Sequence, residues 1–332
     1  MMTYAPVLIS VYHRLYTLRR CVGALLKNKE AKDTDLFVVS DGPARPEHKK
    51  RIEEVRQFVR SIRGFHSVTL IARTGNWGAQ KSIRSACSDI RLHYGCLIFM
   101  EDDILPAPNF LAYMNWGLSR YADDPRVYAV CAYKSKFRMP KSYEEDVYFL
   151  NRYSPWGTAT WRSKVEERYS AKAGFVDRYE AYDRYSEFQQ TMPQQFAELQ
   201  RNDPTMMNVL RMDSEGQIKA GDVRAEYYLL RTGKLCVYPR QTMTQVMSTG
   251  HDAMHATIRW VGDEAFAKNQ MTEFRAGPVA VDERVYDAFL AAKRIPLWRR
   301  ALYAFLHEGF GNAFWYYWSR VFHITWKKKF KE

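Results

Sequence analysis

The sequence predicts an α/β protein built around a mostly parallel β-sheet. Short apolar runs that end in polar turns alternate with longer amphipathic stretches through the first third of the chain. Such alternation is typical of strands that lie parallel in a sheet covered by helices on both faces. With 332 residues, of which 46% are hydrophobic, the chain can also bury a large core.

The first strand is expected at residues 5–11, which form an apolar run. We expect the next helix to begin with Thr17 as its N-cap. The same alternation continues, with strands and helices expected in turn at residues 35–40, 52–62, 67–72, 80–93 and 96–100. These elements form three successive strand–helix units and a fourth strand.

The second half of the chain is less regular. Strands are expected at residues 126–132 and 234–239, but the stretch between 134 and 212 has no clear periodicity. We therefore divide the chain into a nucleotide-binding half at 1–133, an acceptor and catalytic half at 134–262, and a helical extension at 263–332.

Composition restricts the partners and the compartment. The chain has 50 Lys and Arg against 37 Asp and Glu, a net charge of +13, which suits a partner that carries phosphate. Its five cysteines are odd in number and include no CxxC pair, which favours a reducing compartment. The first apolar run is too short to span a bilayer and lacks the pattern of a signal peptide, so we expect a cytoplasmic protein.

Three consecutive carboxylates, Glu101, Asp102 and Asp103, directly follow the fourth strand. Parallel strands gather ligands at their carboxyl ends, so Asp41, after the second strand, should lie in the same crevice. Carboxylates brought together there need a counter-charge, and oxygen ligands favour Mg²⁺ or Mn²⁺. A solvated acidic loop is the alternative interpretation.

Four motifs in this order carry a family resemblance: LISVYHRLYTLRRCVGALL, FVVSDGP, NWGAQKSIRSAC and LIFMEDDILPAPNFLAYM. They resemble the nucleotide-sugar half of inverting glycosyltransferases of the GT-A type. Bacterial polysaccharide glycosyltransferases of family 2 and the N-acetylglucosaminyltransferase that starts complex N-glycans are similar. The resemblance implies a Rossmann-like αβα sandwich, a nucleotide diphosphate sugar as donor, with UDP favoured, and inversion at the transferred sugar.

The resemblance also implies roles for single residues on the donor side. Arg14 would contact the donor diphosphate, Asp41 would accept the imide N–H of uracil, and Asp103 would ligate the metal. Glu101 and Asp102 would contact ribose or bound water. Arg14 as a surface cation and Asp41 as a turn residue remain the alternatives.

A second group of donor residues follows the third strand. The resemblance places Asn76, Trp77 and Gly78 over the nucleotide, where Gly78 permits close approach of the backbone. Lys81 would help to bind phosphate. A core position for Trp77 and a solvated position for Lys81 are equally open.

On the acceptor side, Trp156 and Gly157 belong to a segment that resembles the family's aromatic loop, although Pro155 and Thr158 depart from the usual pattern. Aromatic faces can pack against the apolar faces of sugar rings. We expect Trp161, in contrast, to lie in the core.

Glycosyl transfer needs a base that takes the proton of the acceptor hydroxyl. Asp222 occupies the place of the family's Trp-Asp base, with Gly221 in place of the Trp, and Glu226 and Asp213 are the alternatives. His255 best matches a family histidine that reaches the metal or the leaving phosphate.

The last segment, residues 291–332, holds nine Lys and Arg against two Glu and is rich in aromatic residues. This composition is typical of a helix that lies in a membrane interface, so an anionic membrane surface is a candidate partner. A helix packed on the catalytic domain is the alternative. A lipid-linked glycan acceptor, as in bacterial surface polysaccharide synthesis, would explain membrane attachment.

Other classes of function are weaker. A sugar nucleotidyltransferase would also use metal and carboxylates, but it usually carries a Gly-rich loop after the first strand, which is missing here. A module that binds nucleic acid or acidic glycans would suit the net charge, yet no nucleic-acid signature occurs and we expect no nucleic-acid partner. The absence of GxGxxG excludes a Rossmann dehydrogenase. Donor sugar, acceptor and linkage stay open.

Overall fold

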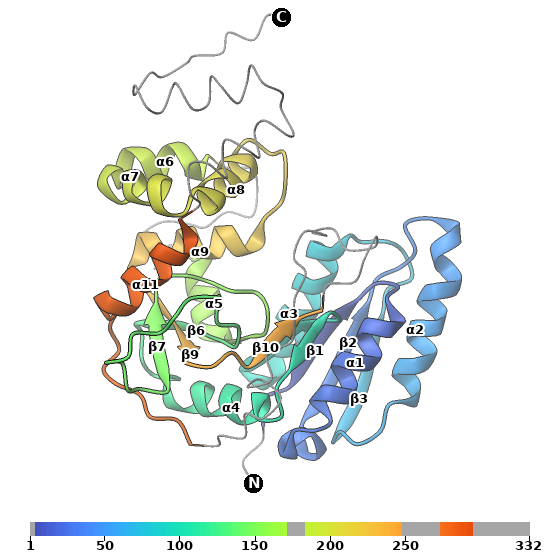
Figure 1. Cartoon of the computed structure of the whole chain (residues 1–332). Coiled ribbons are helices and arrows are strands. Elements are labelled where there is room, and N and C mark those ends of the chain that lie inside the picture. Colours follow the sequence, from blue (N-terminus) through green and yellow to red (C-terminus); the bar gives the residue numbers. More distant parts are fainter. Residues whose placement is uncertain (1–3, 171–182, 248–272, 295–332) are drawn as a thin grey trace, which may run out of the picture.

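The computed structural model describes residues 4–170, 183–247 and 273–294. Its centre is an eight-stranded sheet with the order β3-β2-β1-β4-β8-β6-β9-β7 (Figure 1). Strands β3, β2, β1, β4, β6 and β9 run in one direction, and β8 and β7 run against them. The prediction of a mostly parallel sheet is confirmed.

The strands of this sheet are β1 Val7–Val11, β2 Asp35–Ser40, β3 Ser67–Ala72, β4 Cys96–Glu101, β6 Val127–Cys131, β7 Val147–Leu150, β8 Thr158–Trp161 and β9 Leu235–Pro239. A small antiparallel pair consists of β5 Ile104–Pro106 and β10 Thr244–Val246. The α-helices are α1 Leu15–Leu25, α2 Lys49–Ser61, α3 Ala79–Tyr94, α4 Phe110–Arg120, α5 Arg162–Arg168, α6 Arg184–Thr191, α7 Pro193–Asn202, α8 Pro204–Ser214, α9 Gly221–Thr232 and α11 Glu283–Lys293. Two 3₁₀-helices, η1 Lys29–Asp33 and η2 Pro46–His48, complete the described part.

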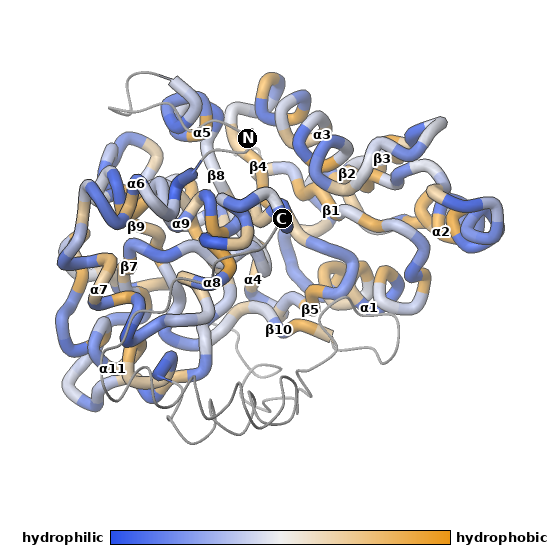
Figure 2. Tube along the Cα trace, turned by 90° about the horizontal axis from the view of Figure 1, so that it is seen from above, coloured by the Kyte–Doolittle hydropathy of each residue, from blue (hydrophilic) through white to orange (hydrophobic). Residues whose placement is uncertain are grey.

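Helices cover both faces of the sheet, which confirms the αβα sandwich. One face carries α1, α2 and α4, whose apolar side chains pack on β1, β2 and β4. The other face carries α3 and, further along the sheet, an aromatic core between the strands and helices α6 to α9 and α11. Figure 2 shows α2 with its hydrophobic side toward the sheet and its hydrophilic side outward.

The strand–helix units begin and end close to their predicted positions, except for the start of α1. This helix begins at Leu15 and has Arg14, not Thr17, as its N-cap. The predicted N-cap was wrong because the backbone N–H of Leu18 already donates to the carbonyl of Arg14, which places Thr17 inside the first turn, where its hydroxyl donates to Asp102.

The middle region contains more order than its periodicity indicated. Strand β8 runs antiparallel between β4 and β6, with Thr158 opposite Phe99 and Trp161 opposite Cys96. The residues before β8 therefore lie at the edge of the sheet where β4 ends, which brings the Trp156 segment to the acidic triplet's end of the sheet.

All five cysteines lie in the described residues and are free thiols. Within the same residues, no helix is long and apolar enough to cross a membrane.

Candidate active site

The acidic triplet lies at the carboxyl ends of β1 and β4, as expected. The backbone N–H of Asp102 donates to the carbonyl of Ser10, 3.0 Å away, which extends the pairing of the two strands by one residue. The loop after β1 and the residues after β4 are thereby held side by side.

Arg14 supplies the counter-charge that the carboxylates need. Its Nη2 lies 2.5 Å from Oδ1 of Asp102, its Nε lies 3.1 Å from Oδ2, and its Nη1 lies 3.0 Å from Oδ2 of Asp103. Among the described residues, a guanidinium supplies part of this counter-charge, and the metal ion expected from the sequence stays a prediction. A contact of Arg14 with the donor diphosphate stays a prediction.

Asp102 is fully engaged by protein groups. Its carboxylate accepts from Arg14 and from the Thr17 hydroxyl, 2.6 Å away, and the residue is only 3% exposed. Burial raises the pKa of Asp102, although the hydrogen bonds from Arg14 and Thr17 oppose that rise. This geometry makes Asp102 the anchor that orients Arg14.

The surroundings of Glu101 disfavour its ionised form. Burial, together with the neighbouring carboxylates of Asp103 and Asp102, raises the pKa of Glu101 to about 7. Arg14 opposes this rise, while Asp222 adds to it. Glu101 therefore changes its charge near neutral pH, and Asp222 lies close enough to affect that change.

Asp103 has one oxygen available. Its Oδ2 accepts from Arg14, but its Oδ1 is buried and has no hydrogen-bond partner within the described residues. A buried carboxylate oxygen without a partner is costly, and a bound cation would relieve the cost. No group of three metal-ligating side chains occurs among residues 4–170, 183–247 and 273–294. Mg²⁺, however, is often held by one or two carboxylates together with substrate phosphates, so Asp103 fits such an ion.

The loop that carries Asp41 is closed by hydrogen bonds. Oδ1 of Asp41 accepts from the backbone N–H groups of Gly42 and Trp77, each at 2.9 Å, and Oδ2 lies 3.3 Å from the Asn76 amide nitrogen. A Cβ atom on Gly42 would lie 2.3 Å from the carbonyl carbon of Gly75. Gly42 is thus required for the close approach of the two loops.

Arg56 of α2 forms hydrogen bonds with the same two loops. Its Nη2 donates to the carbonyls of Ser40, Asp41 and Arg73, at 3.3, 3.2 and 2.8 Å. One guanidinium therefore ties together the ends of β2 and β3. Nothing in the sequence distinguished Arg56 from other helix-surface arginines. Thr17 was predicted only as an N-cap, and its hydrogen bond to Asp102 had no local signal.

Trp77 is exposed rather than part of the core. Its relative exposure is 41%, and its ring lies 4.2 Å from the guanidinium carbon of Arg73 and 5.1 Å from Nζ of Lys81. Gly78 has a φ of +79°, which favours glycine, and it precedes the first residue of α3. These side chains form a cationic, aromatic surface beside Asp41.

Trp156 and Gly157 directly precede β8, which pairs with β4, so they lie at the same edge of the sheet as the acidic triplet. The Trp156 ring packs edge-on against Tyr133 with 4.6 Å between centroids, and its carbonyl accepts from the Thr244 hydroxyl. Gly157 has a φ of +89°, and a Cβ there would lie 2.9 Å from Thr244. Trp161 is buried, as expected, and donates to the carbonyl of Leu118.

Asp222 lies in the first turn of α9 and is exposed. The segment before α9 is joined to the start of α3, because the Gln80 amide donates to the carbonyl of Lys219, 2.9 Å away. The effect of Asp222 on the pKa of Glu101 also places it near the triplet. An exposed carboxylate at this position can receive a proton from a bound acceptor.

Asp213, one alternative base, is sealed in the core. It is 0% exposed, and its carboxylate lies 2.8 Å from Nε of Arg224 and 3.6 Å from Nη1 of Arg184. The backbone N–H of Ala220 also donates to it. These contacts give Asp213 a structural role.

Glu226, the other alternative, lies one helical turn after Asp222. Burial, with contributions from Asp203 and Asp222, raises the pKa of Glu226 to about 7, although Arg152 opposes the rise. Nη1 of Arg152 lies 3.7 Å from its carboxylate. Burial thus makes Glu226 harder to ionise than an exposed glutamate.

His255 falls outside the described residues. The chain before it is described up to Met247, whose backbone N–H donates to the carbonyl of Asp103 at 2.8 Å. The role of His255 as a metal or phosphate ligand stays a prediction.

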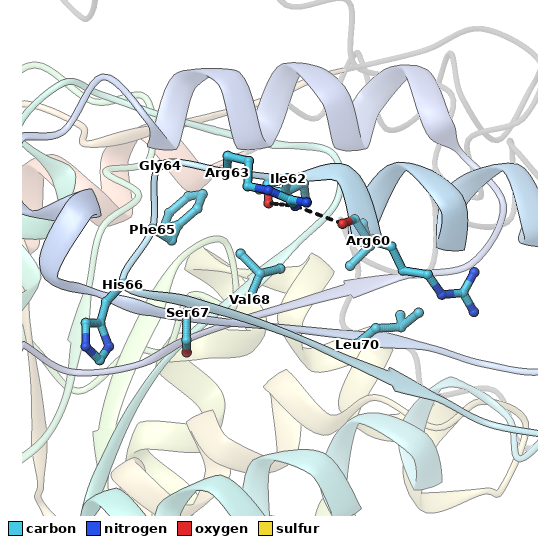
Figure 3. Close-up of a pocket in the computed structure, with 10 residues that line it drawn as sticks. Arg60, Ile62, Arg63, Gly64, Phe65, His66, Ser67, Val68 and Leu70 are labelled. Atoms are coloured by element: carbon cyan, nitrogen blue, oxygen red, sulfur yellow. Dashed lines mark hydrogen bonds between the residues drawn. The ribbon is translucent and has the colours of Figure 1, made fainter.

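A separate cavity between α2 and β3 lies away from this site (Figure 3). It is lined by residues such as Phe65, Val68 and Leu70 and reaches the first residue of β3, Ser67. Ser67 pairs with Asp35, the first residue of β2, so the cavity lies at the amino ends of the strands.

Comparison with known proteins adds solved structures and a family. Among solved structures, S. aureus TarS is similar with a TM-score of 0.39 and 10% identity, covering 73% of this chain and 36% of that chain. TarS 1–349 alone and in complex with UDP-GlcNAc each give a TM-score of 0.41 and 10% identity; the matches cover 74% and 79% of this chain, and 60% and 63% of those chains. The chain thus spans less than two thirds of these relatives. No curated protein matches it.

The glycosyl transferase family 2 model matches residues 7–177, more than half of the chain. The match covers β1 to β8, including the strand ends that carry Arg14, Asp41 and the acidic triplet. The chain belongs to glycosyl transferase family 2.

Proposed function

We propose that this glycosyltransferase moves a sugar from a nucleotide diphosphate sugar, with UDP-sugars favoured, onto an acceptor hydroxyl with inversion. The observation that carries the proposal is the end of β4 in a family 2 chain, where a buried oxygen of Asp103, beside Arg14, has no hydrogen-bond partner among the described residues. Membership of this family also favours sugar transfer over a nucleotidyltransferase or a non-catalytic binding module.

On the donor side, each residue is given a role that its chemistry supports. Asp41 and its loop would hold the base, and Arg14 would bind the diphosphate while Asp102 orients its guanidinium. Asp103, with His255, would hold Mg²⁺ or Mn²⁺, which would neutralise the leaving diphosphate. Glu101 would contact ribose or bound water.

The remaining donor residues would close the nucleotide site. Asn76, Trp77 and Gly78 would lie over the nucleotide, and Lys81 would add positive charge for a phosphate. Exposure of Trp77 supports this role, because a tryptophan packed inside the core could not contact a ligand.

On the acceptor side, Trp156 and Gly157 would form the platform for a sugar ring. Asp222 would take the proton of the attacking hydroxyl, which then displaces the nucleotide diphosphate from the opposite face of the donor sugar. Such a base contributes on the order of 10² to 10⁴ in rate. Its exposed position at the start of α9 supports this assignment over Asp213.

We further propose that residues 1–133 and 134–262 form the donor and acceptor halves. Residues 263–332 would extend them, and the basic segment 291–332 would attach the protein to the cytoplasmic face of an anionic membrane. A glycan or a lipid-linked glycan would then be the acceptor.

The test is a donor screen with UDP-, GDP- and dTDP-sugars and Mn²⁺, in which release of free nucleotide is measured. We expect release from one UDP-sugar, loss of release in Asp103→Asn, and wild-type release in the matched control Asp287→Asn, which changes an exposed carboxylate on α11. Equal release from Asp103→Asn and the wild type would contradict the proposed role of Asp103. Failure of every donor would contradict the proposed function.

A further inference from the structure

A cluster of exposed cations lies where β2 leads into α2. We call it the basic rim and define it as Arg45, Lys49, Lys50 and Arg51, with Glu47 as the acid in the same stretch. All four basic side chains are exposed. In the part of the chain that the structure describes, none of the four forms an ion pair or a side-chain hydrogen bond.

These cations occupy positions that the helix itself disfavours. Lys49, Lys50 and Arg51 form the first turn of α2, which contains no acidic residue. The N-terminus of a helix carries a partial positive charge, so three cations there reduce helix stability. An anion outside the described chain would remove this repulsion.

The basic rim adjoins the proposed donor site. The Tyr12 hydroxyl lies 2.8 Å from Nδ1 of His48, so the loop between β1 and α1 contacts the residue directly before α2. In the first turn of α1, Tyr16 is 64% exposed, and its ring lies 5.7 Å from the guanidinium carbon of Arg20. The exposed tyrosine thus follows the loop that contacts His48, and three of the cations directly follow His48 itself.

We infer that the basic rim and Tyr16 dock on an anionic lipid surface. Basic side chains are attracted to anionic head groups, and tyrosine is enriched at the boundary between lipid and water. The basic rim consists of exposed side chains around the N-terminal end of α2, and exposed side chains can contact a flat membrane surface. A polyanionic chain such as a nucleic acid would bind better in a groove. The cavity in Figure 3 does not provide one beside the basic rim, because it lies at the opposite end of the sheet.

This docking places the proposed donor site next to the lipid surface. If the acceptor is carried by a lipid, its sugar then needs to reach only across the head groups. That consequence rests on the proposed function, whereas the docking itself does not.

The test measures binding of the full chain to vesicles of phosphatidylcholine mixed with phosphatidylglycerol, and to vesicles of phosphatidylcholine alone. The variant Lys49→Gln, Lys50→Gln, Arg51→Gln removes three charges from the rim. The matched control Lys27→Gln, Lys29→Gln, Lys32→Gln removes three charges at the other end of α1 and in η1. Tyr16→Ser tests the aromatic contribution.

We expect binding to the mixed vesicles only. The rim variant should bind about 100-fold more weakly, from about five-fold per basic residue. The matched control should lose much less affinity for the mixed vesicles, and Tyr16→Ser should weaken binding several-fold. Circular dichroism confirms that each variant is folded, and nucleotide release without vesicles should match the wild type, which separates docking from catalysis.

Three results would overturn the inference. The rim variant could bind as tightly as the wild type, or the two triple variants could lose equal affinity, which would indicate a response to net charge alone. The third result is binding to soluble polyphosphate without binding to anionic vesicles, which would assign the rim to a different polyanion.

Discussion

Replacing Glu101 with Gln should stabilise the protein at neutral pH and have little effect at acid pH. The pKa of Glu101 is raised from 4.5 to about 7 by burial and by the carboxylates of Asp103 and Asp102. Between these two values, the unfolded chain releases a proton that the folded chain retains. Stability is therefore highest below the unfolded pKa and falls as the pH rises toward 7. Gln carries no charge at any pH and removes this loss.

The size of the effect follows from the shift. One pKa unit corresponds to about 1.4 kcal/mol, so a rise from 4.5 to about 7 makes the ionised side chain cost about 3 kcal/mol in the folded protein. The difference in free energy of unfolding between Glu101→Gln and the wild type should grow by about this amount between pH 4.5 and pH 7, and stay constant above it.

The assay is urea unfolding at a series of pH values between about 4 and about 8, for both proteins. Glu54→Gln, on the exposed side of α2, is the control for the amide substitution at the surface. A difference that does not change with pH, or one that shrinks toward neutral pH, would show that the buried carboxylates do not control the ionisation of Glu101.

Three further predictions concern the same site. Asp103→Asn should lose the thermal stabilisation that UDP with Mn²⁺ gives the wild type, about 2.7 kcal/mol when the ligand is at about 100 times its Kd. Asp222→Asn should transfer sugar about 10² to 10⁴ times more slowly, with an unchanged melting temperature. Gly42→Ala should lower the free energy of unfolding by about 1–3 kcal/mol because the new methyl group meets Gly75, whereas Gly23→Ala, with nothing within 4 Å, should stabilise α1 by up to about 1 kcal/mol. A full UDP and Mn²⁺ response in Asp103→Asn, wild-type transfer by Asp222→Asn, or equal effects of the two alanines would contradict the respective argument.

The strand–helix units up to β4 could be predicted from the sequence because their signals are local. Strands at 35–40 and 67–72 have their predicted bounds, and α3 extends its predicted range by one residue at each end. In each of these units the apolar pattern, the turn and the next helix are contiguous. The place of the acidic triplet followed directly from the end of the fourth strand.

The region from β8 to α9 could not be predicted in the same way because its structure depends on pairing with residues far away in the sequence. Strand β8 is buried at all four positions, so its sequence shows no alternation, and it forms through pairing with β4 and β6. Helix α9 extends over Asp222, and no helix was predicted at this position. The pairing of Arg14 with Asp102 joins residues 88 positions apart and has no local signal.

The arrangement around Arg56 has a consequence for ligand affinity. This side chain fixes three carbonyl groups at the ends of β2 and β3, while Asp41 is already hydrogen-bonded to the neighbouring loop. In the proposed function, a nucleotide bound there would meet a rigid surface and would lose little binding free energy to ordering the chain. Weakening this support should therefore reduce affinity for the nucleotide, although the guanidinium of Arg56 donates to backbone carbonyls of the protein itself.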